Sequence, residues 1–249
     1  MKKLWTACAM SFSMFCAMPS PFHVWNPELQ PLTTLFLPAV GAWIGVLWSL
    51  LALLLRFLAL PRLFCAALLC AFPFAVTGGM HIDGYLDVTD AVKSWRDLDE
   101  RRRILKDPHS GSFALIACAL LVMMQFALFA SAGPDAEAFT LLFIAVVSRA
   151  LAGLCVTALR PMATSEYAGA YRRGVKRSHI VIFAVVLALA VGLSFLCLGR
   201  YGFASLAVIA GYLLTVRRAV RSLDGMSGDI SGYALTVGEL CGIAVYALI

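Results

Sequence analysis

Charged residues are scarce in this chain of 249 residues: they make up 14% of it, whereas soluble domains contain about 25%. Hydrophobic residues make up 61%, and the mean hydropathy is +0.87. This balance excludes an ordinary soluble domain. Several apolar runs reach the roughly 20 residues that a helix needs to cross a bilayer. The composition therefore predicts an all-α polytopic integral membrane protein.

Three other common signals are also missing. The eight cysteines lie singly in apolar segments without a CxxC pair, which favours helix packing over disulfides or a zinc site. The net charge of +6 is not gathered in a long basic stripe or an aromatic-interleaved basic motif, so we expect no nucleic-acid partner. No internal repeat or low-complexity linker divides the chain. Residues 1–249 are therefore expected to form a single transmembrane domain.

Seven apolar runs are expected to be transmembrane helices: residues 32–55, 63–76, 113–132, 139–159, 180–198, 203–216 and 233–249. A shorter apolar segment, 4–18, could span obliquely, re-enter or lie in the interface. Gly41 and Gly45 suit close helix contact, and Pro73 is expected to bend its run.

The basic residues predict the orientation of the chain. The loops at 79–111, 160–177 and 217–232 hold fourteen of the twenty Lys and Arg residues. Positive loops face the cytoplasm, so all three are placed on that side. Arg56 and Arg62 do not follow this pattern, because they fall on the opposite side. One cytoplasmic-facing site could collect all three loops.

Acidic residues are concentrated in the first of these loops: seven of the fourteen lie between Asp83 and Asp107. Asp83, Asp87 and Asp90 are spaced i, i+4 and i+7, which places them on one face of a helix. A carboxylate at membrane depth costs about 2.5–3.5 kcal/mol, and like charges repel. An all-oxygen set suits Mg²⁺ or Mn²⁺, which share their ligands with substrate phosphates. We expect a metal site here; a solvated helix face, as expected for 97–103, is the alternative.

Other polar residues are candidates for the same site. His81, two residues before Asp83, could be a base, a phosphate donor or an orienting group. Asp229 lies in the glycine-rich segment 221–232, where the backbone could approach a phosphate or metal closely; a plain turn is the alternative. Lys106, beside an Asp and close to a Ser-Gly turn, is the basic residue most suited to a phosphate.

Two charged residues fall inside predicted spans. Arg149 and Glu239 are functional candidates for that reason alone, but they could also pair with each other. The remaining basic residues, including 101–103, are expected mainly to set topology, with anionic headgroups or phosphates as further partners.

Three motifs in the chain resemble those of the cobalamin synthase family, also called adenosylcobinamide-GDP ribazoletransferases. The family's Gly-Gly-x-His-x-Asp-Gly-x-x-Asp-x-x-Asp signature is complete at residues 78–90, and its Lys-Asp-x-x-x-Gly element is matched at 106–111. Its Thr-Gly-Asp-x-x-Gly element is matched at 227–232, with Ser227 for Thr. The resemblance covers essentially the whole chain. Departures are Cys16-Ala17 for a Thr-Arg pair, Asp224 for a common Gly and Thr236 for a common Glu.

This resemblance implies a transferase that joins α-ribazole, or its 5′-phosphate, to adenosylcobinamide-GDP. The ribazole hydroxyl attacks the cobinamide-side phosphorus and GMP leaves, with Mg²⁺ as cofactor. It also implies a bacterial cytoplasmic membrane location with the active site facing the cytoplasm. The residues expected to be catalytic are His81, Asp83, Asp87, Asp90 and Lys106. The expected metal ligands are Asp83, Asp87, Asp90 and Asp229. The expected substrate contacts are Gly79, Gly84, Asp107, Gly111, Arg149 and Gly228.

The sequence is also compatible with two other functions. Another Mg²⁺-dependent membrane transferase is one, because Asp83-x-x-x-Asp87 resembles a prenyltransferase motif and Asp87-x-x-Asp90 partly resembles the CDP-alcohol phosphotransferases. Ala91 stands where the latter need Gly, and Asp224 and Asp229 are wrongly spaced for a second prenyltransferase motif. The other rival is a cation-coupled transporter, which would distribute its carboxylates through several spans. The oligomeric state is left open, a homo-oligomer included.

Overall fold

The computed structural model describes residues 2–17, 24–163, 165 and 176–249. This part of the chain is helical, and its one β contact is an isolated bridge between Pro161 and Met226. The elements in order are α1 (Lys2–Phe15), η1 (Pro27–Leu29), α2 (Gln30–Thr33), η2 (Thr34–Phe36), α3 (Leu37–Phe57), α4 (Arg62–Val76), α5 (Met80–Lys93), α6 (Leu98–Ile104), α7 (Ser112–Ser131), α8 (Thr140–Ala158), α10 (Arg177–Leu198), η3 (Gly199–Gly202), α11 (Phe203–Leu223) and α12 (Gly228–Leu248).

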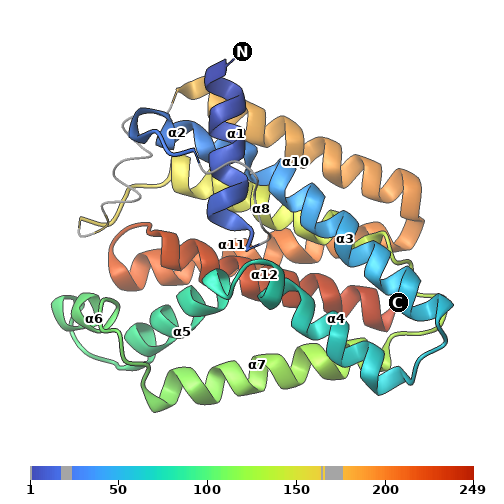
Figure 1. Ribbon diagram of the computed structural model, residues 1–249. Helices are drawn as coiled ribbons and strands as arrows, with labels where there is room; N and C mark the ends of the chain where they lie inside the picture. The colour runs from blue at the N-terminus through green and yellow to red at the C-terminus, as the bar shows by residue number, and fades with distance from the viewer. Residues whose placement is uncertain (1, 18–23, 164, 166–175) are drawn as a thin grey trace.

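Five helical stretches are long and apolar enough to cross a membrane, or six if the bent pair of α4 and α5 is one span. The five are Pro27–Phe57, Ser112–Ser131, Thr140–Ala158, Arg177–Leu223 and Gly228–Leu248. The fourth contains both α10 and α11, between which η3 turns the chain back (Figure 1). The prediction of an all-α integral membrane protein is confirmed. The count of seven spans stays a prediction, because α4 has only 15 residues and bends into α5, and the fourth stretch contains two helices.

The bend between α4 and α5 measures 87° and lies after Pro73, at two consecutive glycines. Gly78 and Gly79 have φ values of +63° and +79°, in the left-handed region that costs other residues about 1–2 kcal/mol. The amide of Gly79 donates to the carbonyl of Phe74 over 2.9 Å, which satisfies the end of α4. The first two residues of the Gly-Gly-x-His motif therefore make the corner that starts α5.

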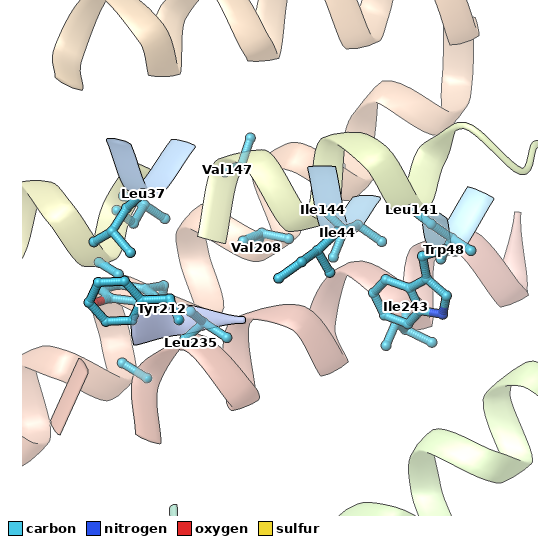
Figure 2. Close-up of a cluster of buried hydrophobic side chains, with 14 of the residues drawn as sticks. Leu37, Ile44, Trp48, Leu141, Ile144, Val147, Val208, Tyr212, Leu235 and Ile243 are labelled. Atoms are coloured by element: carbon cyan, nitrogen blue, oxygen red, sulfur yellow. The ribbon is translucent and has the colours of Figure 1, made fainter. Parts of the chain in front are cut away.

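The core lies between α3, α8, α11 and α12, and Figure 2 shows its buried side chains. Helices in a membrane associate mainly through close packing, for which small residues are suited. A Cβ atom at Gly45 of α3 would lie 2.6 Å from the Cα of Leu142 in α8, and one at Gly41 would lie 2.5 Å from the carbonyl oxygen of Ala145. The predicted close-packing role of both glycines is confirmed.

Three polar segments meet at one end of the helical bundle, at the left of Figure 1. The end of α8 pairs with the turn between α11 and α12, where the amide of Met226 donates to the carbonyl of Arg160 over 2.8 Å. Helix α6 joins them, because Nη1 of Arg101 donates to Oγ of Ser222 over 2.9 Å. The three basic loops, as far as the structure describes them, thus share one end. The C-terminus lies at the other end (Figure 1).

Candidate active site

The first and third motifs interlock where α5 crosses α12. A Cβ atom at Gly84 would lie 2.8 Å from the carbonyl oxygen of Asp229, and one at Gly232 would lie 3.2 Å from the carbonyl oxygen of His81. The hydroxyl of Thr236 also donates to that His81 carbonyl over 3.3 Å. Each glycine therefore faces the backbone of a candidate residue in the other motif. This contact joins segments that lie about 150 residues apart in sequence.

The first and second motifs meet through Asp90. Its carboxylate accepts hydrogen bonds from the amides of Gly111 and, over 3.3 Å, Ala114. These amides belong to the N-terminus of α7, where a carboxylate is favoured by the unpaired N–H groups and the helix dipole. A Cβ atom at Gly111 would collide with the Asp90 carboxylate. Asp90 thus caps α7, and its expected role as a metal ligand stays a prediction.

Three other carboxylates are available to a cation. Asp83 is exposed, while Asp87 and Asp229 are half-buried. Asp83, Asp90 and Asp229 all lie within electrostatic range of Asp87. Their mutual repulsion leaves a region of negative potential at the crossing of α5 and α12. A cation would relieve this repulsion.

The donor chemistry fits Mg²⁺, but the ligands are not assembled. Among the described residues, no group of three or more His, Cys, Asp or Glu side chains is arranged to hold a metal ion. Mg²⁺ is usually held by one or two carboxylates together with waters and substrate phosphates, so a protein-only cage is not required. Asp83, Asp87 and Asp229 would be the carboxylates that hold it. The magnesium site stays a prediction.

His81 places an unpaired nitrogen beside this crossing. Its Nε2 atom is buried and has no hydrogen-bond partner within the described part of the chain. His81 lines a cavity of about 280 Å³ together with Gly228 and Asp229. Buried polar atoms normally have partners, so this nitrogen is available to a polar atom of a bound substrate. That environment suits the expected role of His81 in activating a hydroxyl.

Lys106 and Asp107 lie farther out, on the exposed turn between α6 and α7. Oδ1 of Asp107 accepts from the backbone amide of His109 over 2.9 Å and lies 2.9 Å from its Nδ1. These hydrogen bonds lower the pKa of Asp107 below its usual value. Asp107 therefore stabilises the turn that leads to Gly111. The phosphate-binding role expected for Lys106 stays a prediction.

Arg149 is buried and forms an ion pair with Glu239 between α8 and α12. Ser148 Oγ donates to the same Glu239 oxygen over 2.8 Å. The alternative that the two intramembrane charges pair with each other is confirmed. A direct substrate contact by Arg149 stays a prediction, and the Nη2 atom of its guanidinium is buried without a partner in the described residues.

Sequence patterns missed the role of α6. Arg102 donates to the carbonyls of Leu223 and Asp224, and its guanidinium lies 3.3 Å from Oδ2 of Asp224. Together with the bond from Arg101 to Ser222, these bonds satisfy free carbonyl groups at the C-terminus of α11, where cations are favoured. The segment 97–103 was expected to be a solvated helix face. This is wrong for Arg101 and Arg102, because they dock on a turn more than 100 residues away.

The family described as cobalamin-5-phosphate synthase matches residues 7–247. An adenosylcobinamide-GDP ribazoletransferase of Clostridium perfringens is 32% identical over 251 residues, which is 100% of both chains. Proteins of the same name from Lachnoclostridium phytofermentans and Stutzerimonas stutzeri are 29% and 32% identical, over 98% and 88% of this chain and 93% and 88% of their own lengths. No solved structure matches. With nearly its whole length matched in this way, the chain belongs to the cobalamin-5-phosphate synthase family.

Proposed function

We propose that this protein is an adenosylcobinamide-GDP ribazoletransferase, which completes the nucleotide loop of a cobalamin. The observation that carries the proposal is the meeting of the three motifs at the crossing of α5 and α12 and at the start of α7. The relatives that carry this activity in their names cover the chain from end to end. Against the rival transferases stand Ala91, where the CDP-alcohol phosphotransferases need Gly, and the spacing of Asp224 and Asp229, which does not fit a second prenyltransferase motif.

In the proposed reaction, one bond to phosphorus forms, one breaks, and the residues of the site have separate roles. A ribose hydroxyl that is free in both α-ribazole and its 5′-phosphate bonds to the cobinamide-side phosphorus. The bond from that phosphorus to the bridging oxygen breaks, and GMP leaves with that oxygen. His81 accepts the hydroxyl proton at Nε2, which is buried and unpaired. Asp83, Asp87 and Asp229 would hold Mg²⁺, which neutralises the diphosphate when bound.

The same proposal includes a location and an orientation. The protein lies in a bacterial cytoplasmic membrane, and the end with α5, α6 and the α11–α12 turn faces the cytoplasm. The exposed apolar side chains on α7 and α10 suit contact with lipid. The basic residues gathered at the site end support this orientation through the excess of positive charge in cytoplasmic loops.

A product assay tests the proposed reaction. Purified protein in lipid is incubated with adenosylcobinamide-GDP, α-ribazole and Mg²⁺, and we expect GMP and the corresponding cobalamin in equal amounts. Omitting α-ribazole should abolish GMP release, and so should EDTA until Mg²⁺ is restored. Turnover of prenyl diphosphates or CDP-alcohols in its place would support a rival transferase. Cation flux in proteoliposomes without product would support the transporter.

A further inference from the structure

The cavity beside His81 extends away from the carboxylates into an apolar part of the molecule. Phe15 of α1, Leu37 of α3, Val156 of α8 and Leu235 of α12 form much of its wall. His81 and Asp229 line it as well, and they sit together at the crossing of α5 and α12. The cavity is therefore mostly apolar on the side of α1, α3 and α8, where Thr34 and Ser165 are its polar lining residues, with further polar groups on the side of the proposed reaction.

The size of the cavity limits what it can hold. Its volume of about 280 Å³ is at the small end of ligand pockets, which span about 300–1,000 Å³. A corrin macrocycle is too large for it. A flat bicyclic ring is of a suitable size.

The chemistry of the walls selects among flat rings. A guanine base has several polar atoms along its edges, and burying them without partners would cost about 1–3 kcal/mol each. The walls are mostly aliphatic and aromatic, and the hydroxyls of Thr34 and Ser231 among them already bond to the carbonyl of Pro31 and the hydroxyl of Tyr212. A benzimidazole ring is largely apolar and would lose little on entering. The walls thus suit the base of the ribazole acceptor better than the guanine of the GDP-activated donor.

We propose that this cavity binds the benzimidazole base of α-ribazole and thereby directs the ribose hydroxyl to Nε2 of His81. The inference rests on the proposed function, because the acceptor is taken from it. It adds walls from α1, α3 and α8, which lie outside the three motifs, to the motif residues that line the same cavity. The GDP-activated corrinoid would then approach from the carboxylate side.

The test places a larger side chain in the cavity and measures KM for each of the two substrates separately. Val156→Trp should raise KM for α-ribazole at least tenfold and change KM for adenosylcobinamide-GDP by less than twofold. The matched control is Val185→Trp on the exposed face of α10, which should leave both KM values unchanged. An unchanged KM for α-ribazole in Val156→Trp, or a rise only for the corrinoid, would overturn the assignment.

A second variant covers the case in which Val156→Trp does not fold. Val156→Ala enlarges the cavity and should raise the relative kcat/KM for a riboside with a larger tricyclic base at least threefold over α-ribazole; no shift would contradict the assignment. Binding of α-ribazole alone, measured by calorimetry, separates the two proposals. If wild-type protein binds α-ribazole and Val156→Trp does not, but no GMP is released, the reaction fails and the cavity assignment survives. Normal turnover with unchanged ribazole binding in Val156→Trp overturns only the cavity.

Discussion

At the scale of single residues, the charges of this protein separate into two groups. Asp83, Asp87 and Asp229 lie at the crossing of α5 and α12, and none of them forms an ion pair with a Lys or Arg of the described residues. Arg149 and Glu239 neutralise each other inside the bundle, where their exposed fractions are 1% and 6%. A buried pair is strongly destabilised when one partner is removed, since the other charge is left uncompensated.

Glu239→Gln should therefore destabilise the protein by about 3–5 kcal/mol, because it leaves the Arg149 guanidinium buried without a counter-charge. Thermal unfolding in detergent measures this as a lower Tm. The double variant Arg149→Met/Glu239→Met should recover most of the loss, since replacing both charges by apolar groups is often neutral. A wild-type Tm for Glu239→Gln combined with a raised KM would instead indicate that Arg149 serves the substrate.

At the scale of elements, the site depends on how closely α5 and α12 approach. The sequence predicted helices over 113–132 and 139–159, and the structure has α7 and α8 at Ser112–Ser131 and Thr140–Ala158. Such long apolar runs are recognised by length alone. The corner at Gly78 and Gly79 was not predicted, because hydropathy carries no information on backbone conformation. The docking of α6 was missed for a similar reason: side-chain contacts with a distant turn leave no local pattern.

Gly84→Ala tests the helix crossing. Its new methyl group would lie 2.8 Å from the backbone oxygen of Asp229, which cannot move without shifting α12. We expect at least a tenfold loss of kcat/KM in the GMP-release assay and a lower Tm. Gly192→Ala in α10 is the matched control, because nothing lies within 4 Å of its added carbon. It should keep full activity and could gain up to about 1 kcal/mol from helix propensity. Equal behaviour of the two variants would rule out a tight crossing.

At the scale of the whole molecule, the structure brings together the three motifs, which are spread over residues 78–232 of the sequence. Charge bias alone predicted that the three basic loops share a side, and their contacts agree within the described residues. Sequence reasoning also identified the three motifs. It did not show that glycines join two of them or that Asp90 caps α7, because these are close approaches between distant segments.

Accessibility to a membrane-impermeant maleimide measures the orientation. His109→Cys lies at the site end and Asp135→Cys in the α7–α8 loop at the other end, and both positions are exposed. In intact cells, Asp135→Cys should be labelled above the wild-type background and His109→Cys should not. After permeabilisation both should react. Labelling of His109→Cys in intact cells would place the site outside the cytoplasm.

The central claim is that carboxylates from α5 and α12 act as one site, and a double-mutant cycle on GMP release tests it most directly. Asp87→Asn and Asp229→Asn should each reduce kcat/KM by on the order of 10²- to 10³-fold without changing membrane insertion, and Asp135→Asn at the far end should have no effect. Residues that act as a unit are strongly non-additive, so the double variant should be little worse than either single one. A loss equal to the product of the two single losses, or full activity of Asp229→Asn, would contradict the claim.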